Sequence, residues 1–376
     1  EFTTSGKFKE NNRFAGYVNL PELVRIWSGV SDTVLTKEAG GVKDKIPEME
    51  GGKAQDLYLP QTRALRSIMK FVKSELEHYE QMSGKEKKEN SHIPLTMYGI
   101  AKAAAVDARL VQSDAEDDQN SKTNEAVRQT LRSLKETADY KGTVAIFADN
   151  YQNKQSGFNL YDDIRNKLIA EGVPADEIVV MRSGMTVKKK LEIFEKVNRG
   201  EVRVILGSTF TLGTGVNIQE RLHTLIHLDA PNRPMDYTQR NGRIIRQGNM
   251  NKEVKVFNYV TEGTFDSYLY QTLENKQRFI SQIMTSKSPV RSCEDVDEQA
   301  LSYAEIKALC AGNPLIKEKM DLDVQVAKLK VLKADHQSQK FRLQDKLLTK
   351  FPADIQETNA HIAGLKADAQ LAAAHP

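Results

Sequence analysis

Between residues 141 and 285 the apolar positions follow two different periods. Short runs rich in β-branched residues predict strands at 143–148, 178–181, 202–206, 224–228 and 254–260. Apolar positions at helical spacing lie between several of these runs, for example at 160–170 and 187–198. This alternation predicts an α/β fold, a parallel sheet with helices on both faces. Ligands of such sheets gather where the loops leave the carboxyl ends of the strands.

The segment before this region has a helical pattern. Within residues 61–140 one apolar face recurs at three- and four-residue steps and predicts an amphipathic helix; its members are Leu65, Ile68, Met69, Val72 and Leu76. A second helical stretch contains Val127, Leu131 and Leu134. The acidic, polar residues 113–124 between them predict a solvated loop. Residues 1–60 are mixed, with one helical candidate at 20–27.

The last part of the chain is charged and helical in pattern. From about residue 313 apolar residues keep a three- and four-residue spacing, interrupted at Phe351-Pro352. Proline lacks the N–H donor and clashes with the preceding turn, so we expect a break there. Two helices packed antiparallel as a coiled-coil hairpin is one interpretation. A single helix packed on the globular domain is the other.

Composition narrows the class of protein without revealing its ligand. No window approaches the 18 or so consecutive apolar residues of a membrane span, so no membrane partner is expected. Two cysteines, Cys293 and Cys310, fit neither a metal knuckle nor a disulfide framework and favour a cytoplasmic location. The net charge of +3 is nearly balanced, so nucleic-acid binding would need a localised basic surface. The start at Glu1-Phe2 suggests a piece of a longer protein; a processed mature chain is the alternative.

A glycine-rich segment directly follows the predicted strand at 202–206. Gly213 and Gly215 allow positive φ angles and close approach of the backbone to a ligand. The hydroxyl groups of Ser208, Thr209 and Thr211 can donate to phosphate oxygens. Taken alone, such a loop is also compatible with a tight turn.

A second polar segment follows at residues 239–248. Arg243 and Arg246 are three positions apart and share one face if the segment is helical. Two guanidinium groups on one face suit a triphosphate, and arginine fingers raise phosphoryl-transfer rates by about 10³–10⁵. A solvated basic helix face is the alternative. The pair follows a strand, Asp229 and a proline-bounded turn, and this combination favours phosphate binding.

Residues 141–260 resemble the second RecA-like lobe of Swi/Snf-type superfamily 2 helicase-like ATPases. Residues 208–217 match the motif V pattern S-T-x-x-G-G-x-G-x-N, with Leu212 in place of the first glycine. Residues 229–248 match motif VI, D-x-x-x-x-P…Q-R-x-G-R-x-x-R-x-G. Residues 141–150 and 182–194 resemble the first two strand segments of that lobe. Asn232-Arg233 replaces the usual Trp-Asn and Asn249 the usual Gln, which indicates a bacterial group similar to phage or mobile-element proteins that join an adenine-specific DNA methylase to a helicase lobe.

The resemblance implies roles for individual residues. Arg243 and Arg246 would face the nucleotide, Arg246 as the finger on the γ-phosphate, and Gln239 would help sense the nucleotide state. The loop that links the ATP cleft to DNA would contain Gly213, Gly215 and Asn217. Asp229 would be a further nucleotide-binding position. Ser208, Thr209 and Thr211 would contact the DNA backbone.

The hydrophobic pattern and the resemblance together divide the chain and indicate its partners. Residues 1–60 would be a linker or the end of a preceding lobe, 61–140 a helical section and 141–285 the RecA-like lobe. Residues 286–312 would be a linker and 313–376 the coiled-coil hairpin, with a possible coiled-coil partner. The other expected partners are DNA and the first RecA-like lobe.

Several signatures are missing from the sequence. It contains no G-x-x-x-x-G-K-[ST] phosphate loop and no Walker B strand, so the chain alone is expected not to hydrolyse ATP. ATP with Mg²⁺ would then belong to a complete two-lobed protein. We expect no metal site, because His223 and His227 fall on a predicted strand. A non-catalytic interaction module with a vestigial lobe stays open, whereas a Rossmann-type methyltransferase is disfavoured because the glycine loop follows the third strand.

Overall fold

A computed structural model describes residues 46–152, 157–213 and 215–267 continuously. It also describes shorter stretches, namely 16–18, 26, 29–31, 269–270, 273–274, 277, 292–294, 336, 340–341, 343–344 and 346–374. The chain divides into two compact units. The larger unit comprises residues 1–13, 34–278 and 296–317, and the smaller one 14–33, 279–295 and 318–376. Each unit is described by itself.

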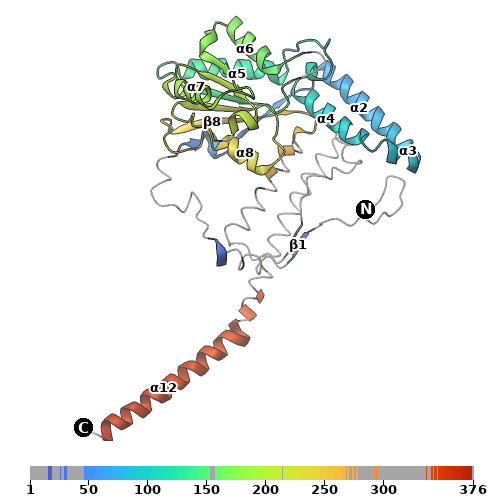
Figure 1. Ribbon diagram of the computed structural model, residues 1–376. Coiled ribbons are helices and arrows are strands. Elements are labelled where there is room, and N and C mark those ends of the chain that lie inside the picture. The colour runs from blue at the N-terminus through green and yellow to red at the C-terminus, as the bar shows by residue number, and fades with distance from the viewer. Residues whose placement is uncertain are drawn as a thin grey trace. The chain divides into compact units, whose positions relative to one another are not determined.

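A parallel sheet forms the centre of the larger unit (Figure 1). Its five main strands stand in the order β8-β7-β4-β6-β5. Their bounds are β4 (Thr143–Phe147), β5 (Ile178–Val180), β6 (Val204–Gly207), β7 (Leu222–His227) and β8 (Glu253–Thr261). All the pairings between them are parallel. The predicted α/β fold is confirmed, and each predicted strand is found within two residues of its expected ends.

The central strand, β4, shows why the sequences of these strands are almost continuously apolar. Every residue of β4 is buried, because helices cover both faces of the sheet. Successive side chains of a strand point to opposite faces. Val144 and Ile146 accordingly belong to one core cluster, and Ala145 and Phe147 to the other.

The helices on the two faces begin and end at recognisable signals. Helices α5 (Lys122–Glu136) and α6 (Leu160–Ala170) contribute to the first core cluster, and α7 (Val187–Arg199) to the second. The side-chain oxygens of Ser121, Asn159 and Thr186 accept backbone N–H groups at the start of these three helices. Gly200, with φ of 74°, ends α7 in the left-handed conformation. The short helix α8 (Pro234–Asn241) follows β7.

The predicted amphipathic helix of the N-terminal section is confirmed as α2 (Arg63–Gln81). All five apolar residues of its expected face are buried, and they pack with residues of α4 (Ile93–Val106) and with Phe265. The short helix α3 (Gly84–Glu89) lies between α2 and α4. The predicted solvated loop at 113–124 is wrong at its end, because α5 begins at Lys122 and its first residues are buried. It is also corrected at Asp117, which forms ion pairs with Lys167 and Arg109.

Two strands lie in the segment expected to be a linker. Strands β2 (Glu48–Met49) and β3 (Gln55–Leu59) both pair in parallel with β8. The sheet therefore includes residues before position 60. The sequence Gln-Asp-Leu-Tyr-Leu has only a short apolar stretch of its own, and its partner strand lies about 200 residues further along, so local pattern did not reveal it.

The smaller unit contains β1 (Gly16–Val18), which pairs antiparallel with β9 (Ser292–Glu294), and the helix α12 (Phe351–Ala374). At Phe351-Pro352, where a break was expected, the structure has no loop; a π-helical turn, η6 (Lys346–Lys350), ends there and α12 begins at Phe351. Proline is tolerated in the first turn of a helix, where its missing N–H is not needed.

The coiled-coil hairpin stays a prediction. The apolar side chains of α12, among them Ile355, Ile362 and Leu365, are 44–60% exposed, so no described residue covers them. Most of the expected first helix of the hairpin, and all of the candidate helix at 20–27 except Ile26, lie outside the described residues. In the part of the chain that the structure describes, no helix is both long enough and apolar enough to cross a membrane.

Candidate functional site

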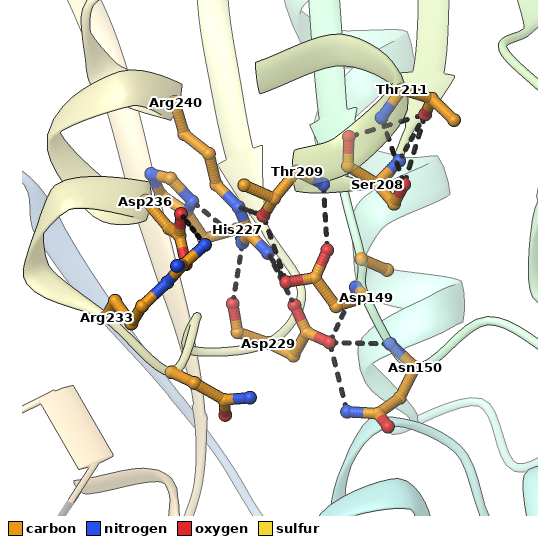
Figure 2. A network of polar contacts seen from close by, with 12 residues as sticks. Asp149, Asn150, Ser208, Thr209, Thr211, His227, Asp229, Arg233, Asp236 and Arg240 are labelled. Carbon is orange, nitrogen blue, oxygen red and sulfur yellow. Dashed lines mark hydrogen bonds and ion pairs between the residues drawn. The ribbon is translucent and has the colours of Figure 1, made fainter. Parts of the chain in front are cut away.

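The loops that leave three neighbouring strands lie at one edge of the sheet. Asp149 and Asn150 follow β4, Ser208 and Thr209 follow β6, and Asp229 follows β7. Because β6, β4 and β7 are adjacent and parallel, their carboxyl ends bring these residues together. Figure 2 shows the polar network that results.

Arg240 of α8 is the centre of this network. Its side chain is fully buried, and its Nη2 donates to Asp149 Oδ2 at 2.7 Å and to Asp229 Oδ1 at 3.2 Å (Figure 2). Its Nε donates to the hydroxyl oxygen of Thr209 at 2.8 Å, and its Nη1 to the backbone carbonyl of Asp229 at 3.0 Å. Desolvation lowers the pKa of Arg240, but the Asp229 and Asp149 carboxylates raise it by more, so the guanidinium is charged and neutralised in place.

The Asp229 carboxylate joins the loop after β4 to the loop after β7. Its Oδ2 accepts the backbone N–H groups of Asp149 and Asn150, each at 2.8 Å. Asp149 in turn accepts the backbone N–H of Thr209 at 2.8 Å and its hydroxyl at 2.9 Å. A single bonded network therefore holds the loops after β4, β6 and β7 against α8.

His227, the last residue of β7, lies beneath Arg240. Its Nε2 is 2.8 Å from Asn241 Oδ1, and its Nδ1 is 3.4 Å from Arg240 Nη1. Because a guanidinium only donates, Nδ1 accepts and Nε2 carries the proton. Burial, and then the charge of Arg240, lower the pKa of His227 to about 3, so the ring is neutral.

Arg243 and Arg246 occupy a different environment. Helix α8 ends at Gly242, and the following residues form turns, so the expected position of the two arginines on one helical face is wrong. The two guanidinium groups still converge, because Arg243 Nη1 and Arg246 Nη1 both donate to the carbonyl oxygen of Val216, the latter at 3.2 Å. Val216 belongs to the glycine-rich segment between β6 and β7.

This arginine pair has no carboxylate partner among the described residues. Arg243 is 8% exposed and bonds otherwise to Gln239, through the backbone carbonyl at 3.1 Å and the side-chain Oε1 at 3.3 Å. Burial, and then the charge of Arg246, lower the pKa of Arg243. Two adjacent cations without a counter-charge favour the binding of an anion. Arg240, only a few residues earlier, is already neutralised.

The glycine-rich segment is held mainly by its own hydroxyl groups. Residues Thr209–Gly213 form a π-helical turn, η5, in which the Thr211 hydroxyl accepts the Ser208 N–H at 2.9 Å. Gly215 has the expected positive φ, 68°. Gly213 does not, and that expectation is wrong; a Cβ there would lie 3.1 Å from Thr209 Cγ2, a tight contact that a small shift of the Thr209 side chain would relieve.

Two further residues of this segment are Leu212, in its middle, and Asn217, an expected site residue at its end. Leu212, which stands where the resembled motif has glycine, is fully buried in the second core cluster. The backbone carbonyl of Asn217 accepts from Asn198 Nδ2 at 3.1 Å, which joins the end of the segment to α7.

Sequence reasoning missed part of this site. Asp149, Asn150 and His227 were not selected, and Arg240 entered only as a match to a motif. The available signal was the position of Asp149, the first charged residue after the wholly buried strand β4. The three consecutive lysines at 188–190 were not predicted to have a role either. They lie in the first turn of α7, shortly after the carboxyl end of β5, and supply the localised basic charge that the overall composition lacks.

A family model described as "Helicase conserved C-terminal domain" matches residues 124–248. Residues 124–248 form a helicase C-terminal domain. This domain runs from α5 through the turns after α8, so it contains the Arg240 network, the glycine-rich segment and the arginine pair. The resemblance inferred from motifs V and VI is thereby confirmed, as is the association with nucleotide-binding helicases.

One curated protein and several solved structures are similar to parts of the chain. "Defense against restriction protein B" of Escherichia phage P1 is 36% identical over 84 residues, which are 22% of this chain and 4% of that protein. The chain therefore spans only a small fraction of the length of this relative.

The solved structures are more distant. The C-terminal part of the Fun30 ATPase domain has a TM-score of 0.43 and 14% identity, over 60% of this chain and 89% of that one. The Pyrococcus furiosus Hef helicase domain has a TM-score of 0.40 and 10% identity, over 63% and 60%. The E. coli DEAD-box protein SrmB has a TM-score of 0.32 and 19% identity, over 43% of this chain and 81% of that one. Because these TM-scores are below 0.5, the assignment rests on the family model.

Proposed function

We propose that the helicase C-terminal domain is one half of an ATP-driven motor that moves along DNA. In this proposal Arg243 and Arg246 provide positive charge to the triphosphate, with Arg246 as the finger on the γ-phosphate. The observation that supports it is the convergence of two guanidinium groups on Val216 without any described carboxylate beside them. A first RecA-like lobe would complete the cleft.

The physical basis is electrostatic. During phosphoryl transfer, negative charge spreads over the oxygens of the transferring group, and prearranged donors stabilise that charge. The low exposure of Arg243 strengthens its interaction with an anion, because little water screens it. Gln239 holds Arg243 through its backbone and side-chain oxygens, so we propose that it positions this arginine.

The donor set also indicates what this domain would not hold. Mg²⁺ prefers carboxylate and water oxygens in near-octahedral geometry. The arginine pair offers only N–H donors and one backbone carbonyl, so it fits the triphosphate and not the metal ion. We propose that Mg²⁺ is held with ATP by the first lobe, as expected from the missing phosphate loop.

On the DNA side, we propose that the loop after β6 and the start of α7 contact the phosphodiester backbone. The exposed Lys188 and Lys189 offer ammonium donors, and Ser208 offers a hydroxyl group that already accepts the Thr211 N–H. The Thr209 hydroxyl bonds to Asp149 and Arg240, and that of Thr211 to Ser208. Thr209 and Thr211 would therefore shape this loop more than contact DNA through their hydroxyl groups. Gly213, Gly215 and Asn217 would carry the connection from this loop to the arginine pair.

A larger setting is also part of the proposal. The phage P1 protein that is 36% identical over 84 residues is named for defence against restriction, and this name supports a role within a larger DNA-modification system. We propose that the segment works in such a protein, next to an adenine-specific DNA methylase. The competing proposal is a non-catalytic module that binds DNA or a coiled-coil partner.

The test uses a polypeptide that carries this segment together with a first lobe. Arg246→Ala is expected to reduce DNA-stimulated ATP hydrolysis by about 10³-fold or more, with the melting temperature unchanged. Arg199→Ala is the matched control, since Arg199 is exposed at the end of α7 and, among the residues that the structure describes, pairs only with Glu195 and Glu201. Unchanged turnover in Arg246→Ala would exclude the finger role. A wild-type protein that binds DNA without hydrolysing ATP would favour the non-catalytic module.

A further inference from the structure

Helix α2 presents a stripe of basic side chains opposite its buried face. The stripe consists of Arg63, Arg66, Lys70 and Lys73, spaced by three, four and three residues. At 100° per residue these positions fall within one narrow sector of the helix. The buried residues, such as Leu65 and Val72, lie on the other side against α4.

The charges along α2 are arranged against the helix dipole. Arg63, Arg66 and Lys70 lie in its N-terminal half and Lys73 just beyond the middle, and the first turn contains no acidic residue. The acidic residues Glu75, Glu77 and Glu80 all lie in its C-terminal half. A helix is stabilised by the opposite arrangement, acids near the start and bases near the end. Positions that break such a local rule are expected where function requires it.

The stripe is also accessible and unneutralised. Arg63, Arg66 and Lys70 are exposed and Lys73 is half-buried. None of the four has an ion-pair partner among the residues that the structure describes. By contrast, most of the arginines in the helicase domain, for example Arg128 and Arg182, are paired with carboxylates. The stripe is therefore a concentrated positive charge on an ordered helix.

The position of the stripe is defined by the sheet. Strand β3 is parallel to β8 and leads through Pro60, Gln61 and Thr62 directly into α2. Helix α2 therefore starts at the carboxyl edge of the sheet, the edge that carries the loops after β4, β6 and β7. The Gln61 side chain donates to the carbonyl of Gly263, in the turn after β8, at 3.0 Å, which ties this start to the sheet.

We propose that Arg63, Arg66, Lys70 and Lys73 form a second nucleic-acid surface, separate from the motif V loop, that lies along a phosphodiester backbone. The stripe extends over ten residue steps, or about 15 Å at 1.5 Å per residue. A polyanion with one charge every few ångströms along each strand matches a line of cations of this length. The inference shares its class of ligand with the proposed function but does not depend on ATP hydrolysis.

The experiment measures binding of the 376-residue chain to a fluorescein-labelled 30-base-pair duplex, and to a 30-nucleotide single strand, between about 50 and 200 mM salt. Arg66→Ala/Lys70→Ala is expected to weaken binding and to reduce the slope of log affinity against log salt by about 2. Lys70→Gln alone should reduce it by about 1. The matched control is Lys85→Ala/Lys88→Ala, which removes two exposed charges from α3 and should leave the slope unchanged. Circular dichroism confirms that each variant is folded.

Each outcome decides the inference. A reduced slope on the duplex, on the single strand or on both supports the stripe, and the two arms identify which form it binds. No binding by the wild-type chain, an unchanged slope in the double variant, or an equal reduction in the α3 control overturns it. Displacement of the duplex by polyglutamate at equal charge would also overturn it in favour of an acidic protein partner. Arg246→Ala should keep the stripe-dependent slope, so failure of the motor proposal is distinguishable.

Discussion

The Asp229→Asn substitution tests whether the Arg240 network holds the functional loops together. Asp229 is 1% exposed, and each group that it contacts is a donor: two backbone N–H groups, the Asn150 amide and the Arg240 guanidinium. Asparagine offers one oxygen and one NH₂ group in place of two oxygens. At least one of these donors must then face another donor, and Arg240 keeps only the partly exposed Asp149 as counter-charge.

The expected cost follows from the burial of the pair. Removing one partner of a buried ion pair destabilises a protein by about 3–5 kcal/mol, because the other charge stays buried and incompletely compensated. Asp149→Asn makes the same change of charge at a carboxylate that is 36% exposed. Water screens that position, so its expected cost is about 1–2 kcal/mol. The two substitutions therefore form a matched pair that differs in burial.

Urea denaturation followed by circular dichroism measures both free energies of unfolding. Hydrogen exchange adds a local measure, since the amides of Asp149 and Asn150 bond to Asp229 and should exchange faster in Asp229→Asn. A loss below 0.5 kcal/mol in Asp229→Asn would refute the reasoning. So would equal losses in the two variants, because they would show that burial of the Arg240 contact does not set the cost.

Two further predictions concern other buried titratable groups. His227 has a folded pKa of about 3 against an ordinary value of 6.5, so between these values the unfolded chain binds a proton that the folded one excludes, and stability falls as the pH is lowered. At pH 5 the resulting loss in the free energy of unfolding is about 2 kcal/mol. His227→Gln should remove this loss, so urea denaturation of the variant should depend less on pH; identical pH profiles of the two proteins would contradict the prediction. Lys122 and Asp266 form a buried ion pair at 2.6 Å, so Lys122→Met should cost about 3–5 kcal/mol and Lys122→Met/Asp266→Leu less; an equal or greater loss in the double variant would contradict this account.

The sheet could be predicted wherever a strand is apolar in itself. Strands β4 and β6 are buried on both faces, so their sequences consist almost entirely of apolar residues. Strand β3 combines Gln55 and Asp56 with only three apolar or aromatic residues, and β8 is the strand to which it is hydrogen-bonded. Its place in the sheet depends on this distant pairing, which no local pattern expresses.

The end of α8 shows a second limit. The spacing of Arg243 and Arg246 is compatible with one helical face, and the expectation followed from that spacing. Gly242 instead ends the helix, and its N–H bonds back to the carbonyl of Thr238. The two guanidinium groups meet through turns, at the carbonyl of Val216, a residue about 30 positions earlier. The spacing in the sequence predicted that the two guanidinium groups lie close together, but not that turns rather than a helix bring them there.

The strongest distinction in the site is one that the motif itself does not contain. Arg240, Arg243 and Arg246 are all arginines of the same sequence motif, yet the pKa of Arg240 is raised and that of Arg243 is lowered. The difference comes from where carboxylates lie in space, since Asp149, which neutralises Arg240, is 91 residues away in sequence. An arginine with two carboxylates has its charge committed to the fold, whereas two arginines that share one carbonyl have charge available for a ligand. A residue's capacity to bind phosphate is therefore decided by its counter-charges, and these are set by the order of strands in the sheet.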